Sequence, residues 1–209
     1  MNSNTPIVFV VDDDFRMREA LSSLLSSAGL RVAAFGSASE FLNSEKPDSP
    51  ACLVLDLELP DINGLELQQE LADRDAPPIV FITAYGDIPT SVSAMKAGAI
   101  EFLSKPFEEQ KLLRAIEAGI ALDRAARRKR SELTELKKHY NLLTPREQEV
   151  FPFVVAGFLN KQTAADLGTS EITIRVHRGQ IMRKMGARSL AELVRMADKL
   201  GMTPARGPV

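Results

Sequence analysis

Short apolar runs alternate with segments of helical periodicity along the first half of the chain. The apolar runs predict strands at residues 7–12, 30–35, 52–57, 78–83 and 100–105. The segments between and after them predict helices at residues 15–28, 37–43, 64–74, 88–97 and 108–122. Strands that are apolar throughout and alternate with helices are typical of buried parallel sheets. The pattern therefore predicts a doubly wound α/β domain with a five-stranded parallel sheet.

From Leu142 onward the apolar pattern has helical periodicity only. Thr144, Pro145 and Glu147 supply the N-cap, the first-turn proline and the capping-box glutamate of a helix. Further helix boundaries follow at Gly157, Gly168, Gly186 and the capping-box pair Ser189 and Glu192. Four short helices predict a small all-α domain.

Residues 119–140 are rich in charge and contain no proline, which predicts a helical linker between the two halves. We therefore expect a first domain at residues 1–122, a helical linker at 123–140 and a helical domain at 141–209. The tail at 203–209 contains two prolines and a glycine, and we expect it to be disordered.

The charges of the two halves have opposite signs, although the whole chain has a formal net charge of only −2. Residues 1–120 hold 9 Lys and Arg against 19 Asp and Glu, a net charge of −10. Residues 121–209 hold 17 against 9, a net charge of +8. An acidic half joined to a basic half indicates a regulated module joined to a nucleic-acid binder, although two solvated surfaces would give the same totals.

Cysteine usage and hydropathy indicate a cytoplasmic protein. The single cysteine, Cys52, lies in an apolar run, where a small core residue is expected rather than a reactive thiol. One cysteine allows no internal disulfide, which fits a reducing compartment. No apolar stretch approaches the length of a membrane span, so we expect no membrane partner.

Polar side chains stand where the apolar runs end. Asp12 and Asp13 follow the first run, Asp56 the third, Thr83 the fourth and Lys105 the fifth. The carboxyl ends of parallel strands meet at one edge of the sheet, and ligands bind there in open α/β sheets. The sequence therefore predicts that these five side chains form one site.

The chemistry of this site follows from its charges. Clustered carboxylates repel one another, and a hard divalent cation such as Mg²⁺ or Mn²⁺ relieves that repulsion. A carboxylate nucleophile can accept a phosphoryl group, and a metal and a lysine neutralise charge on its oxygens. Acidic residues at strand ends also serve as N-caps, which fits Asp14 but not Asp56, because no helical pattern directly follows Asp56.

Residues 5–122 resemble the receiver domain of two-component response regulators, which has a flavodoxin-like fold. The resemblance rests on four motifs that are highly specific in combination: Val11-Asp12-Asp13-Asp14, the segment 55–64 (LDLELPDING), Ile82-Thr83-Ala84 and Lys105-Pro106-Phe107. It implies that a partner histidine kinase donates a phosphoryl group to this domain. It also implies a role for each matching residue.

In this resemblance Asp56 is the phosphoacceptor and Lys105 pairs with the phosphate. Asp13 is a direct metal ligand, Asp12 acts on the metal through water, and Glu58 gives a backbone carbonyl to it.

The resemblance also implies a conformational switch beside the acceptor. Thr83 is the switch hydroxyl and Phe102 the switch aromatic, although its strand setting alone would make Phe102 a core residue. A cis peptide bond is expected between Lys105 and Pro106. The rim residues Glu58 and Tyr85 are expected to tune the lifetime of the aspartyl phosphate.

In the helical half, the segment 170–185 is the candidate recognition helix of a helix-turn-helix. Ile174, Ile181 and Met185 share a face that should pack on the domain core, which leaves Arg175 and Val176 on the outer surface. An exposed valine beside arginines suits contact with a thymine methyl group, although a solvated helix with a stray valine has the same pattern.

Residues 140–201 resemble the LuxR-type output domain of the FixJ/NarL family. The resemblance rests on the segments 143–147 (LTPRE), 160–168 (NKQTAADLG), 173–178 (TIRVHR) and Lys184-Met185. It implies binding to double-stranded promoter DNA, with Arg175, Val176 and His177 on the recognition helix and Lys161 near the backbone. The expected DNA contacts are Lys161, Thr173, Arg175, Val176, His177, Arg178, Arg183 and Lys184.

Two residues depart from what a regular helix favours. Pro152 falls inside the first helix of the output domain, where it removes a backbone donor and should kink the helix without abolishing DNA binding. Gly179 lies inside the recognition helix and costs roughly 1 kcal/mol relative to alanine. Its lack of a side chain would allow close approach to DNA.

The combined prediction is a response regulator whose phosphorylation on Asp56 promotes dimerisation and promoter binding, and which is not a turnover enzyme even if it dephosphorylates itself. One alternative is a transcription factor that acts without phosphorylation, which the complete set of Asp56, Thr83 and Lys105 disfavours. Another is an aspartate-nucleophile phosphohydrolase with Glu58 as acid and base, which the helical domain and the lack of a cap-like insertion disfavour.

Overall fold

A computed structural model describes residues 5–72, 75–84, 87–203 and 205. Contacts between residues divide the chain into two compact units, Met1–Arg127 and Arg128–Val209. The division falls within the segment 123–140, for which the sequence predicts a linker. Each unit is described by itself.

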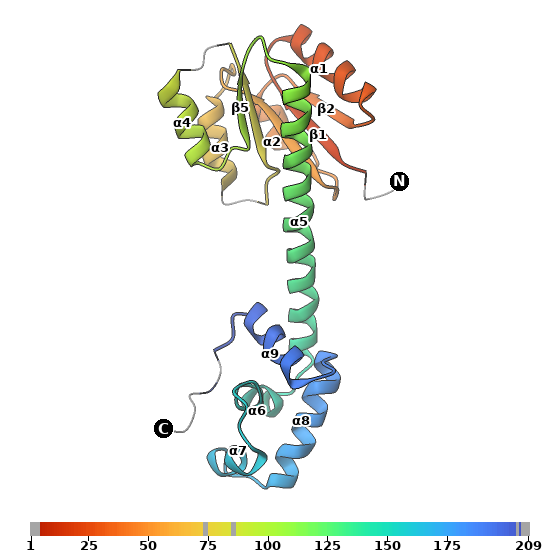
Figure 1. Cartoon of the computed structure of the whole chain (residues 1–209), viewed down its shortest axis with the longest axis vertical. Coiled ribbons are helices and arrows are strands. Elements are labelled where there is room, and N and C mark those ends of the chain that lie inside the picture. The colour runs from red at the N-terminus through yellow and green to blue at the C-terminus, as the bar shows by residue number, and fades with distance from the viewer. Residues whose placement is uncertain (1–4, 73–74, 85–86, 204, 206–209) are drawn as a thin grey trace. The chain divides into compact units, whose positions relative to one another are not determined.

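The first unit is built on a five-stranded parallel sheet (Figure 1). Its strands are β1 (Ile7–Val11), β2 (Arg31–Phe35), β3 (Ala51–Asp56), β4 (Ile79–Thr83) and β5 (Glu101–Ser104). The strand order is β2-β1-β3-β4-β5, so the chain crosses from one side of β1 to the other between β2 and β3. The predicted doubly wound, flavodoxin-like fold is confirmed.

Helices cover both faces of this sheet. They are α1 (Phe15–Ser27), α2 (Ala38–Asn43), α3 (Gly64–Ala72), α4 (Ile88–Lys96) and α5 (Glu109–Asn141). Alternate side chains of each central strand enter opposite cores: Phe9 and Leu53 pack with α2, α3 and α4, whereas Val10 and Val54 pack with α1 and α5. The apolar runs are therefore buried on both faces, which explains why they show no alternation with polar residues.

Helix α5 is one continuous element of 33 residues. The sequence predicts a closing helix at 108–122 and a separate helical linker, but no proline interrupts them and the helix runs through. Its one glycine, Gly119, lies against the sheet, where an added Cβ would stand 2.7 Å from the Cys52 sulfur. Gly119 therefore permits close packing rather than a break in the helix.

Past Gly119, buried polar contacts hold α5 to the start of β3. Asp123 is 3% exposed, and its carboxylate accepts hydrogen bonds from the Ala51 amide at 2.8 Å and from Arg127 Nε at 2.7 Å. Arg127 also pairs with the exposed Asp48 at 2.7 Å. This network lies at the edge of the sheet opposite the strand ends that carry Asp56 and Thr83.

The second unit contains, besides the end of α5, the four short helices predicted from the sequence: α6 (Pro145–Val155), α7 (Asn160–Asp166), α8 (Glu171–Met185) and α9 (Leu190–Lys199). Their shared core includes Val150, Ile174, Ile181 and Leu193. Thr144 and Glu147 form the expected capping box at the start of α6.

Pro152 lies within α6, which continues to Val155 as one helix. The Pro152 carbonyl accepts hydrogen bonds from the amides of Ala156 at 3.0 Å and Ala205 at 3.2 Å. Ala205 belongs to the tail that we expect to be disordered; Pro204 and residues 206–209 of that tail lie outside the described residues.

Within the described part of the chain, no helix has both the length and the apolar character that crossing a bilayer requires.

The contacts of Asp123 give a first prediction. Asp123→Ala should lower the free energy of unfolding by about 1–3 kcal/mol, because the buried Ala51 amide loses its acceptor. Asp48→Ala is the matched control, since it removes the exposed partner of the same arginine and should cause no measurable loss. Urea unfolding of both variants tests this, and equal losses would contradict the assignment of the buried contact as the stabilising one.

Candidate functional site

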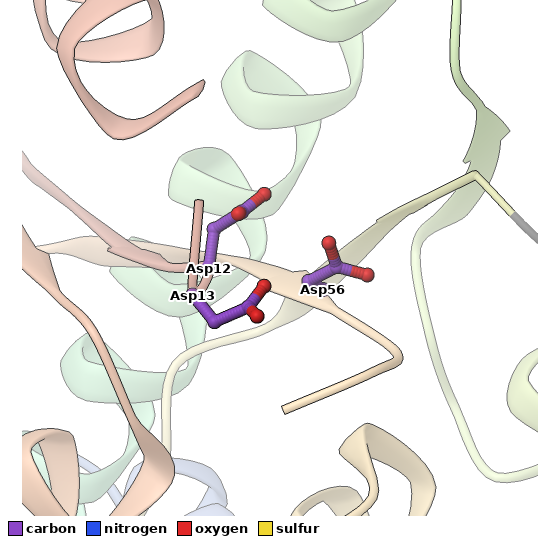
Figure 2. A group of neighbouring side chains, drawn as sticks. All are labelled: Asp12, Asp13 and Asp56. Carbon is purple, nitrogen blue, oxygen red and sulfur yellow. The ribbon is translucent and has the colours of Figure 1, made fainter. Parts of the chain in front are cut away.

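Three carboxylates converge at the carboxyl edge of the sheet, next to the point where the strand order reverses. Asp12 and Asp13 follow β1, and Asp56 is the last residue of β3 (Figure 2). One carboxylate oxygen from each residue lies within 4.8 Å of the others. The structure therefore brings together three of the side chains that the sequence predicts to share a site. Such crevices are where open α/β sheets bind ligands.

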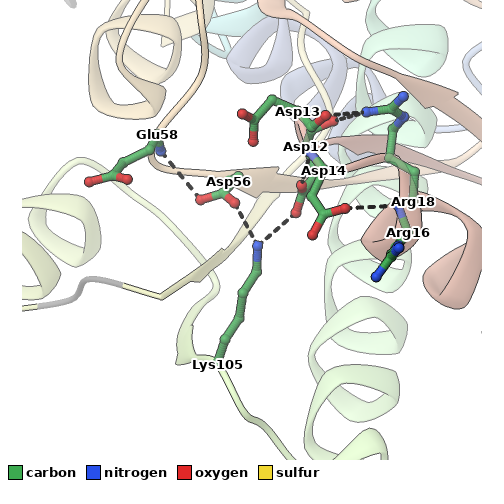
Figure 3. Close-up of polar contacts among 8 residues, drawn as sticks. All are labelled: Asp12, Asp13, Asp14, Arg16, Arg18, Asp56, Glu58 and Lys105. Carbon is green, nitrogen blue, oxygen red and sulfur yellow. Dashed lines mark hydrogen bonds and ion pairs between the residues drawn. The ribbon is translucent and has the colours of Figure 1, made fainter.

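The Lys105 ammonium bridges two of these carboxylates. Its Nζ donates to Asp12 Oδ2 at 2.8 Å and to Asp56 Oδ2 at 2.6 Å (Figure 3). Burial of the fully covered Asp12 raises the pKa of its carboxyl group, and the hydrogen bond from Lys105 only partly offsets this. Burial also works against the Lys105 ammonium, but its hydrogen bonds to Asp12 and Asp56 and the negative charges of these two groups together outweigh that effect and raise its pKa. The lysine is therefore held in its charged form.

The loop that carries the acidic pair is fixed by its backbone. Asp12 Oδ1 accepts a hydrogen bond from the Asp14 amide at 2.8 Å, and Asp14 caps α1 by accepting from the Arg16 amide at 2.8 Å. Arg18 Nη1 donates to the carbonyls of Asp12 at 2.7 Å and Asp13 at 2.9 Å (Figure 3). This role of Arg18 is absent from our sequence analysis; its only signal is a basic residue one turn into the helix that follows the carboxylates.

Asp56 is 6% exposed, and its remaining contact is with the chain that follows it. The Glu58 amide donates to Asp56 Oδ1 at 3.3 Å, while the Glu58 side chain is exposed. Gly64 begins α3 directly behind the strand end, and an added Cβ there would stand 2.5 Å from the Asp56 carbonyl. The close approach of α3 to Asp56 therefore requires glycine, which our sequence analysis did not single out.

Thr83 and Phe102 lie on the neighbouring strands. Thr83 is fully buried at the end of β4, and its carbonyl accepts from the Lys105 amide at 2.7 Å. Phe102 on β5 is half-buried, with its ring centroid 6.0 Å from that of Phe81. The Lys105–Pro106 peptide bond is cis, as the resemblance implies. Tyr85 lies outside the described residues.

The donor set of this pocket suits a hard divalent cation. It offers carboxylate oxygens from Asp12, Asp13 and Asp56 around one position, the ligand type that Mg²⁺ prefers. One ammonium cannot neutralise three carboxylates, and Asp13 is exposed to solvent, so that an ion can reach the site and keep part of its water shell. The residues present therefore fit Mg²⁺ or Mn²⁺.

The second candidate surface is the outer face of α8. Ile174, Ile181 and Met185 are fully buried on the inner face. The exposed positions follow one helical stripe and comprise Glu171, Ile172, Arg175, Val176, Gly179 and Arg183. An added Cβ on Gly179 would meet nothing within 4 Å, so no contact inside the protein requires glycine there.

The cations predicted to contact DNA differ in their surroundings. Among the described residues, Arg175 and Lys161 have no hydrogen-bond or ion-pair partner. Arg178 instead donates to the Phe158 carbonyl at 2.8 Å, and Arg183 donates to Gln180 at 2.5 Å.

Lys184 forms an ion pair with a buried carboxylate of the second unit. Its Nζ lies 2.6 Å from Glu147, which is 4% exposed and also accepts from the Thr144 amide at 2.7 Å. Burial works against the charge of Glu147, but the hydrogen bonds from Lys184 and Thr144 and the charge of Lys184 together outweigh it and lower the pKa of the carboxyl group. Lys184 thus ties the end of α8 to the start of α6. Thr173 and His177 are half-buried beside the exposed stripe.

Comparison with known proteins gives a consistent assignment for both units. Residues 8–117 match the family described as response regulator receiver domain, and residues 141–197 match the bacterial regulatory proteins of the luxR family. Nodulation protein W of Bradyrhizobium diazoefficiens is 51% identical over 202 residues, covering 96% of this chain and 89% of that protein. Transcriptional regulatory protein FixJ of Azorhizobium caulinodans is 42% identical over 199 residues, covering 95% and 94%.

Solved structures of response regulators also superpose on this chain. The response regulator StyR superposes with a TM-score of 0.83 at 51% identity, covering 93% of this chain and 99% of that one. Full-length FixJ from B. japonicum superposes with a TM-score of 0.54 at 37% identity, covering 95% and 98%.

Proposed function

Because the chain belongs to the response regulators that join a receiver domain to a LuxR-type DNA-binding domain, we propose that phosphorylation of Asp56 controls its binding to promoter DNA. A response regulator transcription factor of this kind needs a phosphoryl donor, and we propose a partner histidine kinase in the cytoplasm. The observation that carries the proposal is the Lys105 ammonium held 2.6 Å from the Asp56 carboxylate, beside two further acidic groups.

In the proposed reaction, a carboxylate oxygen of Asp56 attacks phosphorus and the bond from phosphorus to the kinase histidine nitrogen breaks. Lys105 is already placed to pair with an oxygen of the arriving phosphoryl group, and the Thr83 hydroxyl donates to another. Asp13, Asp56 and the Glu58 carbonyl would hold Mg²⁺ or Mn²⁺, with Asp12 acting through water, and the bound ion would supply positive charge for the phosphoryl oxygens.

The product is a signal rather than a released compound, so we propose a switch and not a turnover enzyme, with slow autodephosphorylation as the reset. We propose that the bond from Thr83 to the phosphoryl group pulls the end of β4 toward Asp56, and that the half-buried Phe102 on β5 changes its position in response. Helix α4, beside β5, exposes Ile88, Val92 and Met95 along one side. We propose that this face, residues 88–105, forms a homodimer after phosphorylation.

For DNA binding we propose that Arg175 and Val176 read base edges and that Lys161 holds backbone phosphate. Of the Lys and Arg residues predicted to contact DNA, Arg175 and Lys161 have no partner among the described residues, which leaves them available for DNA. Thr173 and His177, which are half-buried, would lie at the border of the surface that contacts DNA. Arg178, Arg183 and Lys184 bond within the protein, so we propose that they position α8 and contribute to DNA binding chiefly through the electrostatic field of the unit.

The first test concerns the acceptor. Wild-type protein given a small phosphodonor and Mg²⁺ should acquire an acid-stable, base-labile phosphate, and a chelator should prevent this. Asp56→Asn should remove the label because the amide is not a nucleophile. Asp14→Asn is the matched control, since asparagine is an equally good N-cap and should leave labelling unchanged. Undiminished labelling of Asp56→Asn would refute the assignment.

A second test concerns dimerisation. Sedimentation of the phosphorylated chain should show dimers, and Lys96→Glu at the end of α4 should shift the equilibrium toward monomers by reversing a charge in the proposed interface. Arg31→Glu is the control, because Arg31 is an exposed residue on β2 at the opposite edge of the sheet. A fully phosphorylated chain that stays monomeric yet binds DNA more tightly would favour release of inhibition instead.

A third test concerns Gly179. Gly179→Ala should raise the free energy of unfolding by about 0.5–1 kcal/mol, because alanine favours the helix and no neighbour opposes it. It should at the same time weaken binding to duplex DNA severalfold by filling the space on the outer stripe. Gly119 is the contrasting helical glycine. Gly119→Ala should lower the free energy of unfolding, because the new Cβ would stand 2.7 Å from the Cys52 sulfur. Unchanged DNA affinity of Gly179→Ala would contradict a close approach.

A further inference from the structure

Helix α8 presents an apolar pair to solvent that neither folding nor packing explains. Ile172 and Val176 have exposed fractions of 65% and 55%, whereas Ile174 on the inner face is fully buried. Both exposed residues are β-branched and are not favoured by a helix. Single exposed apolar residues are ordinary on protein surfaces, but these two stand one helical turn apart and form one continuous patch.

The surroundings of this patch indicate what covers it. It shares the outer stripe with Arg175 and leads to the open space at Gly179. Residues 121–209, which include α8, have a net charge of +8 and therefore attract a polyanion. The major groove of DNA admits a helix, and its floor is polar except for the C5-methyl group of thymine. An apolar patch flanked by an arginine is complementary to that surface.

We propose that Ile172 and Val176 together contact the methyl groups of two thymines, and that this pair of contacts helps to select the half-site. The inference rests on the proposed DNA-binding function and deepens it, because it gives Ile172 a specificity role and names the base chemistry that is read. One helical turn rises about 5.4 Å and successive bases about 3.4 Å. The two thymines therefore lie about one or two base steps apart.

The test removes single methyl groups from DNA. The full chain, treated with a small phosphodonor, selects duplexes from a randomised pool, and each thymine of the selected duplex is then replaced in turn by deoxyuridine. This replacement deletes the methyl group and leaves the hydrogen-bonding groups unchanged. We expect two positions at which wild-type binding weakens about fourfold, the equivalent of about 0.8 kcal/mol for one buried methyl-sized group.

The protein variants assign each methyl group to a side chain. Ile172→Ala should abolish the deoxyuridine penalty at one position and Val176→Ala at the other. Leu142→Ala is the matched control, because Leu142 is 62% exposed in the same unit but outside α8, and it should keep both penalties. Thermal unfolding checks that the variants fold, which alanine at exposed helical positions should favour.

Each outcome bears on the proposal. A selected site without two such thymines, or deoxyuridine penalties that are the same in wild type and in Ile172→Ala, overturns the methyl contacts and leaves DNA binding intact. A chain that enriches no duplex overturns the proposed DNA-binding function, and this inference with it.

Discussion

Three carboxylates and one ammonium meet at the carboxyl edge of the sheet, and their charges do not balance. Lys105 bonds to Asp12 and Asp56, while Asp13 stands exposed beside them. The excess negative charge is tolerable because the site is open to water and to cations on one side. We expect the same imbalance to make the pocket responsive, because a metal ion or a phosphoryl group would offer new partners to Lys105 and to the buried Thr83.

The surrounding fold holds these groups in place against their repulsion. Arg18 binds the two carbonyls of the acidic loop, and Gly64 lets α3 pack against the backbone of Asp56. The strands that end in Asp56 and Thr83 are buried on both faces, so neither strand can shift without disturbing a packed core. A change at the pocket is therefore expected to propagate along the face of α4 and β5, where apolar side chains are already exposed.

Much of this arrangement could be predicted from the sequence, because it depends on local patterns. The apolar runs predict the five strands, and the acidic residues at their ends, such as Asp12 and Asp56, predict the acidic cluster. Contacts between distant segments could not be predicted: the ion pair of Lys184 with Glu147 and the bond from Arg178 to Phe158 appear only once the helices pack. The predicted helical character of residues 123–140 is confirmed, but the predicted end of the closing helix at residue 122 is wrong, because no stop signal separates the two segments.

The reactivity of Cys52 can report the local opening of the first unit, in which α5 separates from the sheet. The thiol is fully covered beside Gly119, and burial raises its pKa to about 12. In the closed protein a thiol reagent therefore meets neither an accessible sulfur nor a thiolate. Alkylation can proceed only when α5 leaves the sheet, so under fast reclosing its rate measures the free energy of that local opening. Because the chain has a single cysteine, the signal comes from this one interface without further engineering.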